Sequence, residues 1–598
     1  MLEKRLLIKV VKPAGCYRVY RDMNLNEHHK TSVADRIPMG QKVAYGLGGI
    51  VPIALANIVY MLMGIIGNIS LGLSALVLGL VMAVPRLWDA FTDPMMGYIS
   101  DNTRSSAGRR RPYVLWGGIA VCIAFVLLWW IPKGEGASAW VQFGYILLLL
   151  IMFYTAVTVF EIPHGALGME MTADYHERTR LFAAKSFIGN MGAMATPWLY
   201  GLAQLDLFKG AGGNASDGMR YVSLIVAIIV LPCIIICYKV CREGKLEQVK
   251  EQERVPFREN IGVTFRNKTF LLLVAIIFMV IMGFNFVGNF ANYITIFYLY
   301  GGDQVSAAKL MGVTGTVWAV TSLVAIPPMN WISARVGKTL TMLVSISLMA
   351  GGQLTKIWCY NPEHPYLILI PTAMLSAGMV MYFTLASAMV ADVCDEDELH
   401  TGNRNEGAYY SIFWWFMKLG MAFAGIVAGA LLLVSDFDDK QSSMVDAVSG
   451  PVRELKAGFE KDAEMPSAAD VTEKISISIK QNQALADHFR AMQEKVPSDA
   501  EHYAELLEGV ERIDAGLQSI YTGAEEFTKV CDSVLSKALE VSRQSVRTVN
   551  HLRIFEIGIP ILLSVMSFIA MRLYPLSEKR VYEIKAELDR RKETASND

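Results

Sequence analysis

The chain has 598 residues, of which 53% are hydrophobic and only 19% are charged, and its formal net charge at pH 7 is −1. Soluble domains have about 25% charged residues, so this composition excludes a cytosolic enzyme and a disordered protein. Eight cysteines in so long a chain also exclude a disulfide-dense secreted domain. The composition therefore predicts a polytopic helical membrane protein.

Residues 1–42 are polar and carry more Lys and Arg than Asp and Glu. They contain no apolar core followed by a small-residue cleavage site, which a removable signal peptide would need. We expect this segment to remain on the cytoplasmic side.

Twelve segments are long and apolar enough to cross a bilayer, because a hydrocarbon core about 30 Å thick needs roughly 20 apolar helical residues. All twelve are expected to be α-helices, since unpaired backbone groups are too costly in lipid. The predicted spans are Val43–Ile66, Leu71–Tyr98, Tyr113–Ile131, Val141–Ala166, Leu181–Leu205, Val222–Val240, Phe270–Tyr300, Ala307–Met329, Leu340–Tyr360, Tyr366–Val390, Ala408–Val434 and Ile554–Tyr574.

Positive charges alternate between the two sides of these spans. Lys and Arg gather after the second, fourth, sixth and eighth spans and in the tail 575–598, whereas the alternate short loops hold few cations. Cytoplasmic loops are enriched in Lys and Arg, so both termini are expected in the cytoplasm. We expect an integral, multi-pass protein of the plasma membrane, which is the inner membrane in a bacterium.

The charged stretch 242–269 divides the spans into an N-terminal half, residues 43–241, and a C-terminal half, residues 270–434 with 552–574. Charged loop positions recur in both halves. Twelve spans in two similar six-helix halves are typical of the major facilitator architecture, in which the substrate binds near the midplane between the halves. We expect the charged loops to act as cytoplasmic gates, and their residues are Asp101, Arg109, Arg110, Arg111, Asp174, Arg178, Asp392 and Arg404.

The second span carries two carboxylates inside an apolar run. Asp89 and Asp93 are four residues apart and therefore lie one above the other on one helix face, with the Thr92 hydroxyl nearby. Two like charges repel unless a cation lies between them, and a hard cation prefers such oxygen ligands. Arg86, one turn away, could neutralise one carboxylate. The alternative is that Asp93 and Arg86 only cap the helix or extend to the interface.

The fourth span contains Glu161 at its middle, with Thr158 three residues earlier on the same face. Ionisable residues at membrane depth usually face a cavity or a partner. His164 follows one turn later and has three possible roles: a hydrogen-bond donor to substrate, a proton carrier or an interior packing residue.

Lys418 lies inside the eleventh span and is the expected countercharge for the buried carboxylates. Asp89, Asp93 and Glu161 sum to −3, whereas Arg86 and Lys418 supply +2. The deficit of one charge favours a bound monovalent cation or a proton.

Polar side chains on other spans are candidates for contacts with substrate. Asn285, Asn289 and Asn292 recur at helical spacing on the seventh span, where they either line the pathway or join helices by hydrogen bonds. Asn57 and Trp414 could supply an amide and an aromatic face, although aromatic residues also occur at membrane interfaces.

Residues 435–551 form a polar insert between the eleventh and twelfth spans, with 22 acidic residues against 13 Lys and Arg. Apolar residues from Tyr503 to Ile520 step by three or four, which predicts amphipathic helices. We expect a small extracytoplasmic helical bundle that serves as a structural cap or docks a partner. It holds no charge at membrane depth, so we expect transport to continue without it.

The motif Asp89-Ala90-Phe91-Thr92-Asp93-Pro94, followed by Gly108-Arg109-Arg110-Arg111-Pro112-Tyr113, strongly resembles the signature of the glycoside–pentoside–hexuronide:cation symporters. The resemblance continues through Asp174–Leu181, Asp392–Gly407 and Lys418. It covers nearly the whole chain except residues 1–40 and 435–551.

The resemblance implies a cation site formed by Asp89, Thr92, Asp93 and Thr158, and a carboxylate at Glu161 that contacts sugar. The family often has Asn at the position of Thr92, which leaves the choice among Na⁺, Li⁺ and H⁺ open. The sugar-binding Lys-Asp pair of melibiose permease is absent from Gly49–Ile53, and Lys185 is the nearest match to the cation on its fifth helix. A eukaryotic branch resembling this family moves lysophospholipids.

The predicted function is symport of a sugar, glycoside or uronide with Na⁺ or H⁺ by alternating access, with no enzymatic activity and no bound cofactor. The predicted partners are a small carbohydrate and the lipid bilayer, and no nucleic acid. One alternative is a cation-coupled transporter of a lysolipid-like solute. Another is a transport-inactive sensor or scaffold whose insert binds an extracytoplasmic partner.

Overall fold

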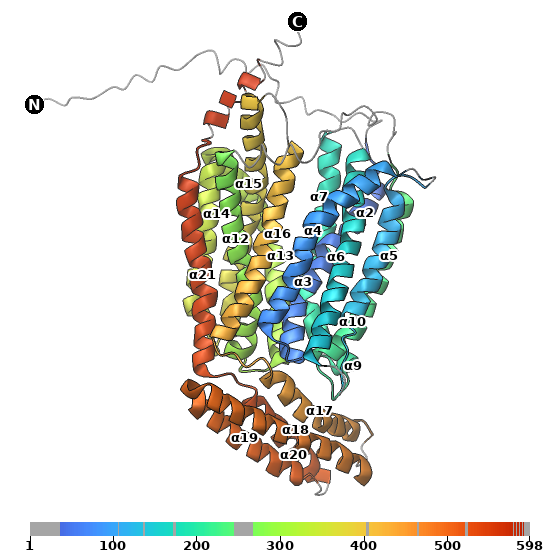
Figure 1. Cartoon of the computed structure of the whole chain (residues 1–598), viewed down its shortest axis with the longest axis vertical. Helices are drawn as coiled ribbons and strands as arrows, with labels where there is room; N and C mark the ends of the chain where they lie inside the picture. Colours follow the sequence, from blue (N-terminus) through green and yellow to red (C-terminus); the bar gives the residue numbers. More distant parts are fainter. Residues whose placement is uncertain are drawn as a thin grey trace, which may run out of the picture.

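The computed structural model describes residues 36–103, 105, 107–134, 138–171, 175–243, 267–401, 406–462, 466–520, 524–577 and, in the tail, 579–581, 583–584, 586–588 and 590. A bundle of long helices makes up most of the molecule, and helices α17–α20 form a separate layer across one end (Figure 1). We call this end of the bundle the insert end. The opposite end, where α2 begins and α21 ends, is the terminal end (Figure 1).

Eleven of the described helical segments are long and apolar enough to cross a membrane. Several continue through internal prolines, as α4 does through Pro85 and Pro94. The elements of the N-terminal half are α2 Met39–Gly48, η2 Val51–Leu55, α3 Ala56–Ile65, η3 Ile66–Ser70, α4 Ala75–Asn102, α5 Arg111–Leu128, α6 Ala139–Glu170, α7 Tyr175–Met194, α8 Thr196–Ala203, α9 Asp206–Lys209 and α10 Ala215–Val240. Those of the C-terminal half are α12 Lys268–Tyr293, η4 Ile294–Leu299, α13 Gln304–Val336, α14 Lys338–Cys359, η5 Pro365–Ile368, α15 Leu369–Thr401, α16 Glu406–Val434 and α21 Val546–Arg572.

The predicted span 181–205 is the one not counted among these eleven. It is two helices, α7 and α8, separated at Ala195 just before Pro197, which occupies the first turn of α8. Pro lacks the backbone N–H that a continuous helix would need at this point. This fifth predicted span is therefore a broken helix, which packs beside α2 and α13.

Polar residues in the loops determine where several of the long helices begin. Asp303 accepts hydrogen bonds from the first backbone N–H groups of α13, and Asn214 and Asp217 form a reciprocal cap at the start of α10. Ser545 caps α21 by accepting a hydrogen bond from the backbone N–H of Thr548. Such caps satisfy backbone donors that have no partner within the helix.

Among the residues that the structure describes, the apolar core is continuous between the halves toward the insert end. One buried cluster contains the N-terminal half together with Phe290 of α12, Ala308 of α13 and Ala428 of α16, all in the parts of these helices nearer the insert end. A second cluster contains the remaining parts of α12, α14, α15 and α16 with the end of α21. The two halves are thus packed together at the insert end.

The insert is a bundle of four described helices with its own apolar core. Apolar residues at helical spacing, such as Tyr503, Val510 and Leu517, are buried in it. The helices are α17 Gln441–Asp462, α18 Ala468–Lys495, α19 Ala500–Gln518 and α20 Ala524–Val541, with the short turn η6 Pro497–Asp499 before α19. They lie beyond the ends of the spanning helices (Figure 1).

Candidate functional site

Helices α4 and α16 bring two carboxylates and an ammonium group together between the halves. Lys418 Nζ lies 2.5 Å from Asp93 Oδ2 and 3.3 Å from Asp89 Oδ2. Asp89 is buried, whereas about a quarter of the Lys418 and Asp93 side chains is exposed. The i, i+4 spacing on α4 places both carboxylates on one face. The ammonium group of Lys418 occupies the position between them that the sequence assigned to a cation.

Helix α6 contributes a hydroxyl to this cluster. Thr158 Oγ1 donates a hydrogen bond to Asp93 Oδ1 at 2.8 Å. The Thr92 hydroxyl instead donates to the carbonyl oxygen of Trp88 in its own helix at 3.3 Å. Asp93 and Thr158 are therefore joined directly, and Thr92 is buried beside them without a described contact to either carboxylate.

Arg86 approaches the same oxygen of Asp89 that Lys418 contacts. Its Nη1 atom is 3.8 Å from Asp89 Oδ2, and its Nη2 atom donates to Tyr154 Oη at 3.0 Å. The guanidinium also stacks 4.2 Å from the centre of the Tyr154 ring. Sequence reasoning missed Tyr154, although it lies four residues before Thr158 and therefore on the same face of α6.

One carboxylate oxygen is left without a hydrogen bond. Asp89 Oδ1 is buried and has no partner among the residues that the structure describes. Burying an unpaired charged oxygen is costly. The site could relieve this cost by taking up a proton or a monovalent cation, with Asp93 and Thr158 as further oxygen ligands. Glu161 is half-buried on the same helix as Thr158.

A pocket lies beside the cluster, between α3, α4, α12 and α16. Its polar lining comes from Tyr60, Arg86, Asn289, Asn292 and Tyr293, and the rest is apolar side chains and glycine. Arg86 belongs both to the pocket and to the carboxylate cluster. This arrangement would let a bound solute and a cation influence one another.

The amides of α12 do not all face this pocket. Asn289 and Asn292 line it, whereas Asn285 is buried and donates to the carbonyl oxygen of Ile281 in its own helix at 2.8 Å. This position favours packing over a place in the pathway, the two roles that the sequence left open for Asn285. The other two amides remain candidates for binding substrate.

His164 is also a packing residue. It is fully buried, with its ring stacked on Tyr45 at 4.3 Å and on Phe160 at 5.3 Å. Its Nε2 atom is 3.0 Å from the carbonyl oxygen of Tyr45. Both faces of the ring are covered, which favours interior packing among the three roles that the sequence left open.

Three other predicted substrate residues lie away from the pocket lining. Lys185 packs against Gly49, where a Cβ atom would lie 2.8 Å from Lys185 Cγ. Asn57 is half-buried on α3, and Trp414 is 42% exposed on α16. Their roles in binding stay predictions.

The predicted gating arginines hold the loop before α5. The backbone N–H groups of residues 109–111 donate to the Glu243 carboxylate at 2.7–3.1 Å. The side chains of Arg109 and Arg110 form ion pairs with Glu170 at the end of α6. These described contacts join elements of the N-terminal half.

In the C-terminal half, Asp392 of α15 pairs with Lys338 at the start of α14, with 2.6 Å between Nζ and Oδ2. The other predicted gating positions lie outside the described residues, either wholly or in their side chains: Asp101, Asp174, Arg178 and Arg404.

A second buried ion pair was not anticipated. Lys356 of α14 pairs with Glu556 of α21, and both side chains are at most 3% exposed. The sequence contained a signal, because each residue is an ionisable group inside a predicted span. The pair joins two helices of the C-terminal half.

Comparison with known proteins agrees with this geometry. The family model described as MFS/sugar transport protein matches residues 44–450. An isoprimeverose transporter of Lactiplantibacillus pentosus is 26% identical, over 63% of this chain and 76% of its own length. The sodium-dependent lysophosphatidylcholine symporter 1 of Mus musculus is 23% identical, over 60% of this chain and 71% of its own length. The crystal structure of the nucleoside transporter NupG shares the fold, with a TM-score of 0.50 and 12% identity over 72% of this chain and 100% of its own length.

Proposed function

Because this chain belongs to the MFS/sugar transport protein family, we propose that it is a secondary active transporter that moves a sugar, glycoside or uronide together with a cation. The observation that carries this proposal is the buried oxygen Asp89 Oδ1, which has no described partner although it lies beside Asp93 and Lys418. Costly charges at membrane depth are retained where a pathway uses them.

The coupling cation, Na⁺ or H⁺, would bind between Asp89, Asp93 and Thr158. With no cation bound, the Lys418 ammonium group partly neutralises the two carboxylates. A cation that enters weakens this ion pair and frees Lys418 to interact elsewhere. If binding of the cation raises the affinity for substrate, linkage requires that substrate raise the affinity for the cation by the same factor.

Movement of substrate then follows from the architecture. The two six-helix halves rock around the midplane site and expose it to one side at a time. We place the insert end outside and the terminal end in the cytoplasm, because Lys and Arg gather in the loops at the terminal end. The described packing between the halves closes the insert end.

A second candidate substrate class is supported by the pocket itself. Its lining is mostly apolar, with few hydrogen-bond donors and acceptors, and a relative is named for lysophosphatidylcholine. A solute with an apolar part, such as a glycoside with a hydrophobic aglycone or a lysolipid, would match this lining.

The proposal predicts gradient-driven uptake by the purified protein in proteoliposomes. We expect at least one labelled pentoside, hexoside or glucuronide to accumulate when a Na⁺ or H⁺ gradient is imposed, and accumulation to stop when an ionophore dissipates that gradient. Lysophosphatidylcholine in the same panel tests the second class. Absence of gradient-dependent uptake across the whole panel would favour the scaffold alternative.

A further inference from the structure

The two halves approach very closely at the insert end. A Cβ atom on Gly79 of α4 would lie 2.5 Å from the Gly425 carbonyl oxygen of α16. One on Gly429 would lie 2.6 Å from the carbonyl oxygen of Ala75. These contacts leave no room for a solute to pass. The pathway must therefore open here during alternating access.

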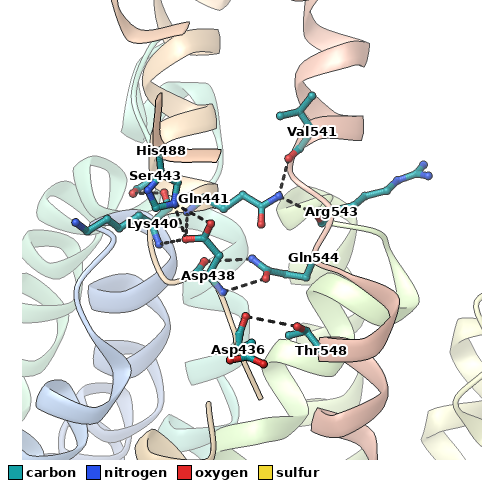
Figure 2. Close-up of polar contacts among 10 residues, drawn as sticks. All are labelled: Asp436, Asp438, Lys440, Gln441, Ser443, His488, Val541, Arg543, Gln544 and Thr548. Atoms are coloured by element: carbon teal, nitrogen blue, oxygen red, sulfur yellow. Dashed lines mark hydrogen bonds and ion pairs between the residues drawn. The ribbon is translucent and has the colours of Figure 1, made fainter. Parts of the chain in front are cut away.

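The insert is fixed to the C-terminal half at the point where its two ends meet. Asp438 donates its backbone N–H to Gln544 Oε1 at 3.1 Å, and Gln544 Nε2 donates back to the Asp438 carbonyl at 3.2 Å (Figure 2). Gln441 Nε2 donates to the carbonyl oxygens of Val541 and Arg543 at 2.7 and 2.8 Å. These residues tie the exit of α16 to the entry of α21.

The helices of the insert are joined to Asp438 as well. His488 of α18 places Nε2 within 2.8 and 2.9 Å of the two Asp438 carboxylate oxygens (Figure 2). Phe437 packs edge-on against Tyr293 and Phe297 of the C-terminal half. Asp438 and Gln441 are buried. The insert is therefore expected to move with the C-terminal half.

The insert also contacts the N-terminal half. Asn68 Nδ2 donates to Asp439 Oδ1 at 2.6 Å. A Cβ atom on Gly72 would lie 2.4 Å from Ser443 Oγ. One on Gly450 of α17 would lie 2.5 Å from the carbonyl oxygen of Gly212 in the loop before α10.

Asn68 is the residue where all three parts meet. Its side chain is fully buried, and it accepts a hydrogen bond from Tyr293 Oη of the C-terminal half at 3.0 Å. It also donates to the Leu73 carbonyl at 2.7 Å and to Asp439. Two of these three hydrogen bonds, those with Tyr293 and Asp439, depend on the halves and the insert being together.

We infer that residues 438–450 of the insert act as a lock that keeps the insert end of the pathway closed. The inference rests on the proposed function, because it assumes alternating access. The insert is anchored to one half and contacts the other, so its contacts with Asn68, Gly72 and Gly212 must break before the pathway can open at this end. The sequence-based expectation that transport continues without the insert stays a prediction beside this one.

The test measures opening of the insert end without any substrate. Spin labels at Leu207 of α9, which is 84% exposed, and at Tyr366 of η5, which is 55% exposed, report the distance between the halves in nanodiscs. Gly450→Leu places a side chain against Gly212, and overpacking of this kind is expected to raise the separated population roughly fivefold or more.

A matched control lies two turns along the same helix. A Cβ atom on Gly458 meets nothing within 4 Å, so Gly458→Leu should leave the distance distribution unchanged. Because Gly450 precedes a proline, Gly212→Leu provides a second variant that wedges the same contact from the N-terminal half. Unchanged distances in both folded wedge variants would overturn the lock. Failure of uptake in the substrate panel would instead concern the proposed function, since this measurement uses no substrate.

The lock should also respond to pH through Asp439. Burial raises the pKa of this carboxyl to about 6. Asn68 and Tyr293 of the spanning helices face it, as do Asp438 and Lys440 in its own segment. A pKa above its ordinary value means that the closed state binds the proton more tightly than a solvated open state. Protonation of Asp439 therefore stabilises the closed state as pH falls through about 6, and this added stability is lost as pH rises through the same value.

Between pH 7 and pH 5, this shift predicts a roughly tenfold rise in the ratio of closed to open molecules. The Leu207–Tyr366 distance distribution measures that ratio. Asp439→Asn, which stays neutral, should remove most of the pH dependence. His488→Gln separates the contribution of His488, which faces Asp438. A pH response that persists fully in Asp439→Asn would contradict the role of Asp439.

Discussion

Asp93→Asn is expected to abolish accumulation of substrate against its gradient while the protein still inserts and folds. The asparagine keeps the size of the side chain, and its Oδ1 atom can still accept the hydrogen bond that Thr158 now donates at 2.8 Å. The substitution removes the charge that Lys418 contacts at 2.5 Å. A hydrogen bond to a charged group is worth about 1.5–3 kcal/mol, so cation affinity should fall roughly tenfold or more.

Two measurements separate cation binding from transport. Cation-dependent thermal stabilisation of the purified variant reports binding, and proteoliposome uptake reports transport. Asp206→Asn is the matched control, because the Asp206 side chain is 76% exposed on α9, away from the carboxylate cluster. If Asp93→Asn accumulates substrate as the unmodified protein does, Asp93 is not part of the cation site.

Lys418→Ala is expected to destabilise the protein strongly, because Asp89 and Asp93 lose the ammonium group between them. Removing one partner of a buried ion pair typically costs about 3–5 kcal/mol. Since about a quarter of Lys418 and Asp93 is exposed, we expect the lower end of that range. The free energy of unfolding, or the midpoint of thermal unfolding in detergent, measures the loss.

A double-mutant cycle identifies which carboxylate Lys418 balances. Combining Lys418→Ala with Asp89→Asn or Asp93→Asn should recover part of the lost stability, with a coupling of about 0.5–3 kcal/mol for residues in contact. Glu161→Gln is the comparison, and its coupling should be smaller because no ion pair with Lys418 is described. Strictly additive effects in both carboxylate cycles would show that Lys418 does not balance this cluster.

The parts of the site that lie on one helix could be predicted from the sequence. The spacing of Asp89 and Asp93 places both on one face of α4 in any α-helix. The charge count across the spans pointed to Lys418, because an unbalanced charge in a membrane is costly. The insert was equally visible, since its polar composition interrupts the apolar spans.

Contacts between distant segments could not be predicted in this way. The sequence could not show that Tyr154 supports Arg86, that Lys356 pairs with Glu556 across two helices, or that His164 lies in the packed core. Each depends on how helices rotate and pack against one another, which helical periodicity within a single segment does not specify.

The insert shows most clearly the difference between features set within one segment and contacts made between segments. Its helices follow from the periodicity of its own apolar residues, which are buried in its own core. Its contact with the N-terminal half includes a hydrogen bond between Asn68 and Asp439, which are 371 residues apart in the chain. Local sequence thus determined the spans, the carboxylate pair and the insert helices, because their geometry repeats within one segment. Only tertiary packing decided which buried charges pair and which half the insert closes upon, because those choices arise where separate segments meet.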